Sequence, residues 1–214
     1  MNGAEALLNT LVDGGIEICF ANPGTSEMQL VQAIGQTEAM RPVLCLFEGV
    51  VSGAADGYAR MADKPAATLL HLGSGFSNSL ANMHNARRAG SPIVNIVGDH
   101  ASYHLQFDAP LTSDLPAIAR WGSHHTEIAR SPEDLSAAGA RTLQAAQRGN
   151  GQIATLIAPA DFAWTEATEA ASALPAPKPL AVGTQRIERA AEAMRGEGRT
   201  CVLLGGRALR EHNL

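Results

Sequence analysis

Two titratable side chains stand where apolar runs of the sequence end. Glu48 directly follows residues 43–47 (VLCLF), and His71 follows residues 66–70 (AATLL). The apolar run before Glu48 suggests an apolar setting, which suits a carboxyl group that acts as a general acid or base. Imidazole titrates near neutral pH, so His71 suits proton transfer. The plainer interpretations are a glutamate that stabilises a helix N-terminus and a buried core histidine.

Short apolar runs alternate with longer helix-like segments along the first 160 residues. Strands are expected at residues 16–21, 42–47, 66–72, 92–97, 126–129 and 152–157, and helices at residues 4–12, 25–34, 48–61, in a segment ending near 89, and after Ser131. Apolar strands separated by helices predict a parallel sheet covered on both faces, which is the doubly wound α/β class. Because ligands of such sheets bind at the carboxyl ends of strands, residues 22–26, Glu48 and residues 71–78 are the candidate site.

The alternating pattern breaks near residue 165. Residues 1–165 are predicted to form one domain, and the Pro- and Ala-rich residues 166–183 a semi-rigid linker. Residues 184–214 are predicted to begin a second α/β unit, with a helix at 186–194 and a strand at 201–204. One strand is too little to bury a core, so we expect the natural protein to be longer than this chain.

Composition excludes several classes of partner. Sixteen Lys and Arg residues stand against 21 Asp and Glu residues, for a net charge of −5, which argues against nucleic acid. The three cysteines are widely spaced with no CxxC pair, so we expect free thiols in a reducing cytoplasm and no metal site in this chain. No apolar run approaches the roughly 20 residues of a membrane span, and the N-terminus is unlike a signal peptide.

Three motifs occur in order at the candidate site. Residues 22–24 (NPG) form a turn, residues 48–60 (EGVVSGAADGYAR) join a glutamate to a helix of small residues, and residues 71–78 (HLGSGFSN) have a G-x-G-x-x-N spacing. Together they resemble the N-terminal pyrimidine-binding domain of thiamine-diphosphate-dependent enzymes of the acetolactate synthase, pyruvate oxidase and benzoylformate decarboxylase group. The resemblance covers residues 1–165, and the residues after it look like the start of the family's central domain.

The resemblance implies a role for each matching residue. Glu48 would share a proton with N1′ of the cofactor's aminopyrimidine, and His71 would transfer protons near the substrate. The remaining implied residues contact the cofactor or line the substrate pocket. They are Pro23, Gly24, Gly73 and Asn78 for the cofactor, and Thr25 and Leu111 for the substrate. For Thr25 the plainer interpretation is a helix cap.

The family further implies a decarboxylase or carboligase that acts on a 2-oxo acid through thiamine diphosphate and magnesium, the latter held by a domain absent from this chain. FAD binding depends on the central domain, so both cases stay open. The family also implies a homodimer or homotetramer through this domain, and we expect the small-sided helix face of Ser52, Gly53, Ala55 and Asp56 to form the contact. The fragment alone is expected to be inactive. The Phe-Gln-Glu segment of true acetolactate synthases is replaced by residues 109–112 (APLT), which is closer to the decarboxylase pattern. The chain is therefore called acetolactate synthase-like, and genuine acetolactate synthase activity is not expected from the resemblance.

Three alternatives stay open at this point. The chain could be the pyrimidine subunit of a split two-chain decarboxylase. It could be a Rossmann or flavodoxin-like nucleotide-binding module, although the Gly73-x-Gly75 pair follows the third strand instead of the first. It could also be a non-catalytic homologue, against which the presence of Glu48 argues.

Overall fold

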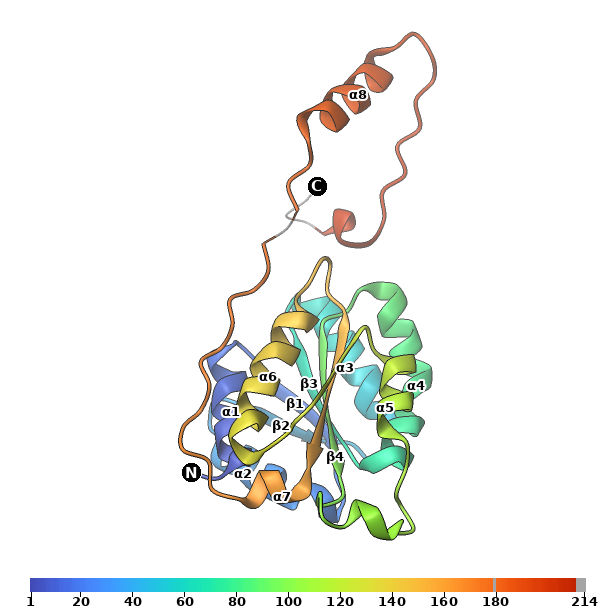
Figure 1. The fold of residues 1–214 in the computed structure, drawn as a ribbon. Coiled ribbons are helices and arrows are strands. Elements are labelled where there is room, and N and C mark those ends of the chain that lie inside the picture. The colour runs from blue at the N-terminus through green and yellow to red at the C-terminus, as the bar shows by residue number, and fades with distance from the viewer. Residues whose placement is uncertain (179, 211–214) are drawn as a thin grey trace. The chain divides into compact units, whose positions relative to one another are not determined.

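The computed structural model describes residues 1–178 and 180–210. Its centre is a six-stranded sheet in which every neighbouring pair of strands is parallel (Figure 1). In sheet order the strands are β2 (Arg41–Leu44), β1 (Ile18–Asn22), β3 (Ala66–Leu70), β4 (Ile93–Asp99), β6 (Ile153–Pro159) and β5 (His125–Ile128).

Helices cover both faces of this sheet (Figure 1). On one face lie α1 (Gly3–Asp13), α2 (Met28–Gln36), α6 (Pro132–Ala146) and α7 (Ala160–Trp164). On the other lie α3 (Glu48–Ala62), α4 (Leu72–Ala89) and α5 (Leu115–Gly122). Alternate residues of β4 face the two layers, with Val94 and Ile96 in one core and Ile93 and Val97 in the other. The predicted doubly wound α/β fold is therefore confirmed.

Local signals in the sequence explain where several helices begin and end. Asn2 and Glu5 form a reciprocal capping box at the start of α1. Ser131 caps α6, whose first residue is a proline. Gly90 ends α4 in the left-handed conformation with φ 67°.

A buried polar ladder crosses three central strands. The Thr68 hydroxyl donates to Asn95 Oδ1 at 2.7 Å, and Asn95 Nδ2 donates to Thr155 Oγ1 at 3.0 Å. Ser123 then joins Thr155 at 2.5 Å between hydroxyl oxygens. All four side chains are buried, so the ladder satisfies groups whose burial would otherwise destabilise the fold, and it fixes the register of β3, β4 and β6.

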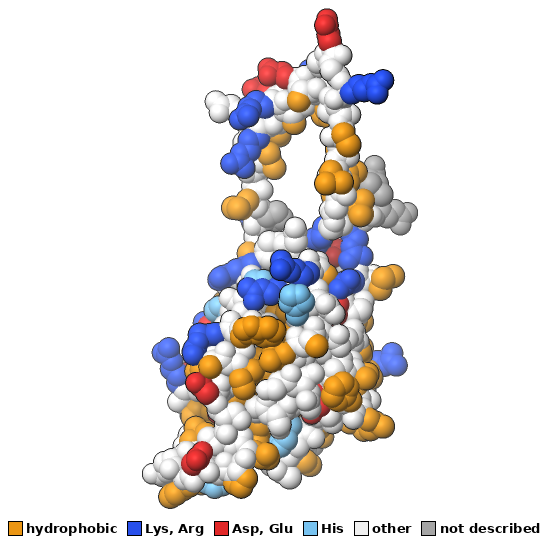
Figure 2. All heavy atoms as spheres, turned by 90° about the vertical axis from the view of Figure 1, so that its right-hand side faces the viewer, with side chains coloured by type: hydrophobic (Ala, Val, Ile, Leu, Met, Phe, Trp, Pro, Cys, Tyr) orange, Lys and Arg blue, Asp and Glu red, His pale blue; other side chains and the backbone are white. Residues whose placement is uncertain are grey.

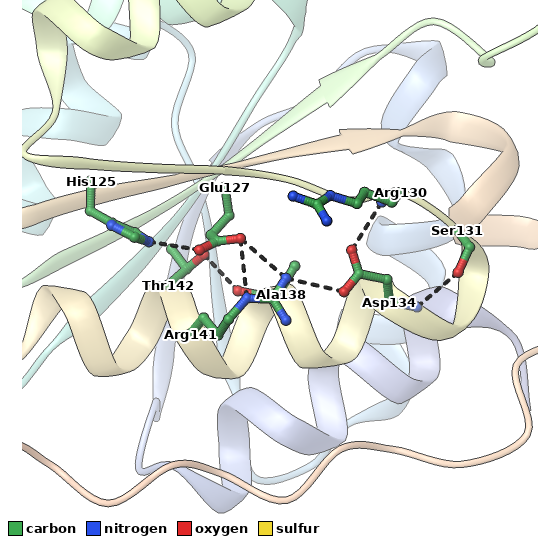
Figure 3. A network of polar contacts seen from close by, with 8 residues as sticks. All are labelled: His125, Glu127, Arg130, Ser131, Asp134, Ala138, Arg141 and Thr142. Carbon is green, nitrogen blue, oxygen red and sulfur yellow. Dashed lines mark hydrogen bonds and ion pairs between the residues drawn. The ribbon is translucent and has the colours of Figure 1, made fainter.

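The edge strand β5 is attached to α6 by charged side chains (Figure 3). Arg141 of α6 contacts Glu127 of β5 and Asp134 of α6, each at 3.1 Å, and His125 lies 2.9 Å from Glu127. Asp134 also accepts from the backbone amide of Arg130 at 3.1 Å. These contacts cover one side of the edge strand, so we assign the network a structural role.

The structure differs from the sequence-based expectation at the other edge. The strand expected at residues 42–47 ends at Leu44, and the side chains of Leu44, Leu46 and Phe47 are exposed. The apolar setting expected for Glu48 is therefore not formed by this run within the chain. The physical reason is strand order, because among the described strands β2 pairs only with β1 and so lies at the sheet edge.

Two further local expectations change. Helices α5 and α7 were not predicted, and the glycine-rich stretch after His71 is the start of α4 instead of a loop. Residues 201–204 form no strand, since no other strand among the described residues pairs with them. Residues 179 and 211–214, which belong to the predicted linker and second unit, lie outside the described residues.

The chain divides into two compact units, Met1–Pro177 and Lys178–Leu214. The second contains α8 (Thr184–Arg195). Residues 166–175 belong to the first unit and pack on it. Thr10 Oγ1 donates to the Ala171 carbonyl at 2.7 Å, and the Ala171 amide donates to Ser136 Oγ at 3.1 Å. Within the described residues, no helix is both long and apolar enough to span a membrane.

Candidate functional site

The predicted site residues lie at the carboxyl edge of the sheet. β1 ends at Asn22, β3 ends at Leu70 just before His71, and α3 begins at Glu48 shortly after β2. In a parallel sheet these strand ends share one edge, where open α/β sheets bind ligands.

Glu48 is held by a residue of the third motif. Asn78 Nδ2 donates to Glu48 Oε2 at 3.1 Å, and within the described part of the chain it is the one side chain that bonds this carboxylate. Asn82, one turn further along α4, donates to the Gly49 carbonyl at 2.6 Å and ties the start of α3 to α4. Glu48 is half-buried and Asn78 is exposed, so the carboxylate is oriented yet accessible.

The side chains of Glu48 and His71 both lie close to Gly75. A Cβ atom built on Gly75 would lie 3.1 Å from Glu48 Oε1 and 3.4 Å from His71 Cβ. The second glycine of the G-x-G pair therefore allows both side chains to approach the first turn of α4. Gly73, the predicted cofactor contact, instead faces its own chain, because a Cβ there would lie 2.2 Å from Ser113 Oγ.

His71 is paired with a glutamate that the sequence analysis did not select. His71 Nδ1 lies 2.8 Å from Glu27 Oε2, and the same oxygen accepts from the Gly24 amide at 2.7 Å. A Cβ on Gly24 would lie 2.4 Å from the His71 ring, so the glycine of the NPG turn makes room for the imidazole. With Nδ1 directed at Glu27, Nε2 is the nitrogen left for a ligand.

Glu27 is completely buried, and its side chain has 0% exposure. Burial raises the pKa of Glu27, although the Gly24 amide and His71 act in the opposite direction. Its second oxygen, Oε1, has no hydrogen-bond partner among the described residues. A Cβ atom on Gly98, at the end of β4, would overlap this oxygen. The lack of a side chain at Gly98 therefore provides the space for the carboxyl group.

The sequence carried one weak sign of Glu27. A residue three positions after a helix cap often reaches back to the cap's amide, and Glu27 does so toward Gly24. The sign is weak because the cap is a glycine. The alternative interpretation of Thr25 as a helix cap is wrong, because the cap position of this short helix, residues Thr25–Glu27, is occupied by Gly24.

The other predicted residues lie around this centre with fewer contacts. Pro23 is half-buried next to Gly24, and Thr25 is exposed. Leu111 is 46% exposed in the segment before α5, and its carbonyl accepts from Ser113 Oγ at 3.3 Å. Ser113 packs against Gly73, so this segment covers the start of α4.

The arrangement combines an oriented, accessible carboxylate with an imidazole held by a buried glutamate. Such a pair of groups can share or transfer protons with a ligand at the sheet edge. Among the described residues no group of three or more His, Cys, Asp or Glu side chains is placed to hold a metal ion.

Comparison with known proteins identifies the family. Residues 1–126 match the family model described as thiamine pyrophosphate enzyme, N-terminal TPP binding domain. A protein of Mycobacterium tuberculosis, provisionally named acetolactate synthase large subunit IlvX, is 51% identical over 210 residues, which are 98% of this chain and 40% of that protein. The acetolactate synthase large subunit of Haemophilus influenzae is 30% identical over 135 residues, 63% of this chain and 24% of that protein.

Solved structures share the fold. Benzoylformate decarboxylase from Polynucleobacter necessarius superposes with a TM-score of 0.81 at 21% identity, over 90% of this chain and 36% of that one. The thiamine diphosphate-dependent 4-hydroxybenzoylformate decarboxylase of Rhodococcus jostii RHA1 gives a TM-score of 0.77 at 22% identity, over 90% and 37% of the two chains.

The fold and the site together define an α/β domain whose candidate site lies at the carboxyl ends of its strands. With the family match, the chain belongs to the thiamine pyrophosphate enzymes and contains their N-terminal TPP-binding domain. The chain spans about 40% of the length of the M. tuberculosis relative.

Proposed function

We propose that this chain provides the aminopyrimidine-binding half of the active site in an enzyme that decarboxylates or ligates a 2-oxo acid. The observation that carries the proposal is the Glu48 carboxylate, held by Asn78 at the sheet edge with Oε1 beside Gly75. Whether the enzyme acts as a lyase or as a transferase depends on whether the acceptor is a proton or a second carbonyl compound.

The residues present fit thiamine diphosphate. Glu48 has one bonded oxygen and one oxygen next to a glycine backbone, so it can accept a proton shared with a ring nitrogen. Asn78 orients that carboxylate, and Pro23 and Gly24 shape the neighbouring turn. The bound cofactor would supply an electron sink for the carbanion left by decarboxylation.

His71 is proposed as the proton-transfer residue on the substrate side. Glu27 holds Nδ1, which directs Nε2 toward the ligand and fixes the ring orientation. Thr25 and Leu111 are both exposed on neighbouring segments, and we assign them to the substrate pocket.

Partners complete this half-site. Magnesium and the diphosphate group would be held by a second domain, on the same polypeptide or on a separate one as in a split decarboxylase. FAD, if present, would bind outside residues 1–165. We further propose a homodimer or homotetramer in the cytoplasm.

The dimer contact needs a different surface from the one expected. Ser52, Ala55 and Asp56 are buried within the chain, and Gly53 lies beside Asn82 of α4. The small-sided face of α3 therefore packs internally. Leu46, Phe47 and Val50, which are 91%, 51% and 54% exposed, are the proposed apolar contact.

The test is Glu48→Gln in the assembled enzyme, read as C2 proton exchange of bound thiamine diphosphate. The amide keeps the volume and cannot share the proton, so exchange should slow by about 10² to 10⁴-fold, or about 3 to 5 kcal/mol of barrier. Glu17→Gln is the matched control, because Glu17 lies before β1 and pairs with Lys64 on the surface. An unchanged exchange rate in Glu48→Gln would leave Glu48 as a helix-end residue only.

A further inference from the structure

A hollow lies at the opposite end of the sheet from Glu48. It has a volume of about 550 Å³ and is lined by His84, Arg87, Arg88, Arg120, Trp121, Gly122 and His124. These residues come from the C-terminal turns of α4 and α5 and the residue before β5. Because α4 begins at the carboxyl edge, its last turn must lie at the amino edge. The hollow is therefore separate from the proposed active site.

The lining of this hollow is positively charged in a chain whose net charge is −5. It includes three arginines and no carboxylate. Within the described residues Arg87, Arg88 and Arg120 form no ion pair, whereas Arg60 and Arg141 each pair with carboxylates. Figure 2 shows basic and histidine side chains gathered on the face that carries α4 and α5, with hydrophobic side chains beside them.

Helix-end stabilisation does not account for this much charge. Basic residues in a last turn offset the negative end of the helix dipole, which is equivalent to about half a charge per helix. Two helices end here, so about one positive charge would suffice. Three arginines leave an excess of about two charges for a ligand.

An aromatic side chain and a neutral donor stand beside the arginines. Trp121 is 59% exposed, which is unusual for a large indole, and its carbonyl accepts from Arg87 Nη1 at 3.2 Å. His124 Nδ1 accepts from the Ile153 amide at 3.2 Å, which leaves Nε2–H directed away from that bond. Guanidinium groups bind phosphate oxygens in pairs, and an exposed indole stacks on a planar ring.

We propose that this hollow binds a nucleotide, with its phosphates on Arg87, Arg88 and Arg120 and its base against Trp121. The volume lies in the usual range of small-molecule sites, about 300–1,000 Å³. The ligand class is a nucleoside diphosphate, since three guanidinium groups can bind the oxygens of two phosphate groups.

The experiment uses Trp121 as the reporter. In the chain carrying Trp164→Phe, Trp121 is the one remaining tryptophan. ADP, inorganic pyrophosphate and adenosine are titrated separately, with fluorescence and calorimetry as readouts. We expect ADP to bind and quench the indole, pyrophosphate to bind more weakly with less quenching, and adenosine not to bind.

Matched variants locate the binding. Arg120→Gln should weaken ADP binding about tenfold or more, and because the Arg120 side chain forms no hydrogen bond or ion pair with the described residues, the fold should be kept. Trp121→Leu, followed by calorimetry, should weaken binding of ADP and not of pyrophosphate. Arg41 lies at the start of β2, the outer strand on the opposite side of the sheet from β5. Arg41→Gln removes an equal charge and should leave the affinity for ADP unchanged.

Three results would overturn the proposal. The first is no binding of ADP at millimolar concentration to a folded chain. The second is an equal loss of affinity in Arg41→Gln and Arg120→Gln, which would indicate diffuse charge attraction. The third is loss of ADP binding in Glu48→Gln with Arg120→Gln unaffected, which would place ADP at the other edge. Failure of the thiamine proposal leaves this test unchanged.

Discussion

Glu27 is held in the interior by groups from three parts of the chain. Gly24 donates its amide, His71 contributes its ring, and Gly98 leaves space for the second oxygen. The residue has no exposed surface and contacts the His71 ring, so we assign it the role of positioning His71.

The first residue-scale prediction concerns pH. Burial raises the pKa of Glu27 above the ordinary value of about 4.3, so the native state binds the proton more tightly than the unfolded state. Between these two pKa values the free energy of unfolding of the wild type should fall as pH rises. In Glu27→Gln this contribution is absent, so the stability of the variant relative to wild type should increase through the same window.

Urea unfolding from pH 4 upward measures this difference, with Glu17→Gln as an exposed control. Wild-type stability that rises with pH relative to Glu27→Gln would contradict the assignment, and would mean that the pairing with His71 outweighs burial.

A second residue-scale prediction concerns the three free thiols. Burial raises the pKa of Cys19 to about 12 and also raises the pKa of Cys45. Because the thiolate is the reactive form, both should resist iodoacetamide at pH 8, whereas exposed Cys201 should react. Mass spectrometry should show one rapid modification in the native chain and three in urea. Rapid labelling of Cys19 in the folded state would show that the α1 layer opens readily.

At the scale of elements, close approach at strand and helix ends sets the site. The start of α4 lies against Glu48 at Gly75 and against the segment before α5 at Gly73. The end of β4 lies against the Glu27 turn at Gly98. Lack of space requires glycine at Gly73 and Gly98 and favours it at Gly75, since none of the three has a positive φ.

A pair of glycine substitutions tests this explanation. Gly98→Ala would place a methyl group on the Glu27 carboxyl, so it should lower the free energy of unfolding by about 1–3 kcal/mol. Gly57→Ala lies in the middle of α3 with no atom within 4 Å of the new Cβ, so it should raise stability by about 0.5–1 kcal/mol. Thermal and urea unfolding give both values. Equal effects of the two substitutions would show that contact with Glu27 is not what constrains β4.

At the scale of the whole molecule, the boundary of the first unit lies later than the composition suggested. Prolines and alanines predicted a linker from residue 166, yet residues 166–175 pack on α1 and α6. Ala167 is buried, and Asp13 Oδ2 accepts from the Ala173 amide at 3.0 Å.

Truncation checks the boundary. A chain ending at Pro177 should unfold at the same denaturant midpoint as the first unit of the full chain. A chain ending at Thr165 should be less stable by about 1–3 kcal/mol, because it loses several hydrogen bonds worth about 1 kcal/mol each. Equal stabilities of the two truncated chains would show that residues 166–175 act as a linker.

The sequence alone determined the layers, the parallel sheet and the position of Glu48 at the start of a helix. These features can be predicted because the spacing of apolar residues and the run of small residues after Glu48 are local properties of the sequence. It also placed His71 at the carboxyl end of a strand, because the apolar run before it is β3. It did not determine which strand is at the edge, and so it mistook the exposed run before Glu48 for a buried one. Strand order is set by pairing between distant segments.

Glu27 shows most clearly what only the tertiary structure decided. Its partner His71 is 44 residues away, and the space for its carboxyl group comes from Gly98 on a third strand. The gathering of Arg87 and Arg120 around Trp121 likewise depends on two helices that end side by side. Local sequence indicates most of the helices and strands, but the burial and charge at one point depend on every segment packed there. Those sums exist only once the chain has folded.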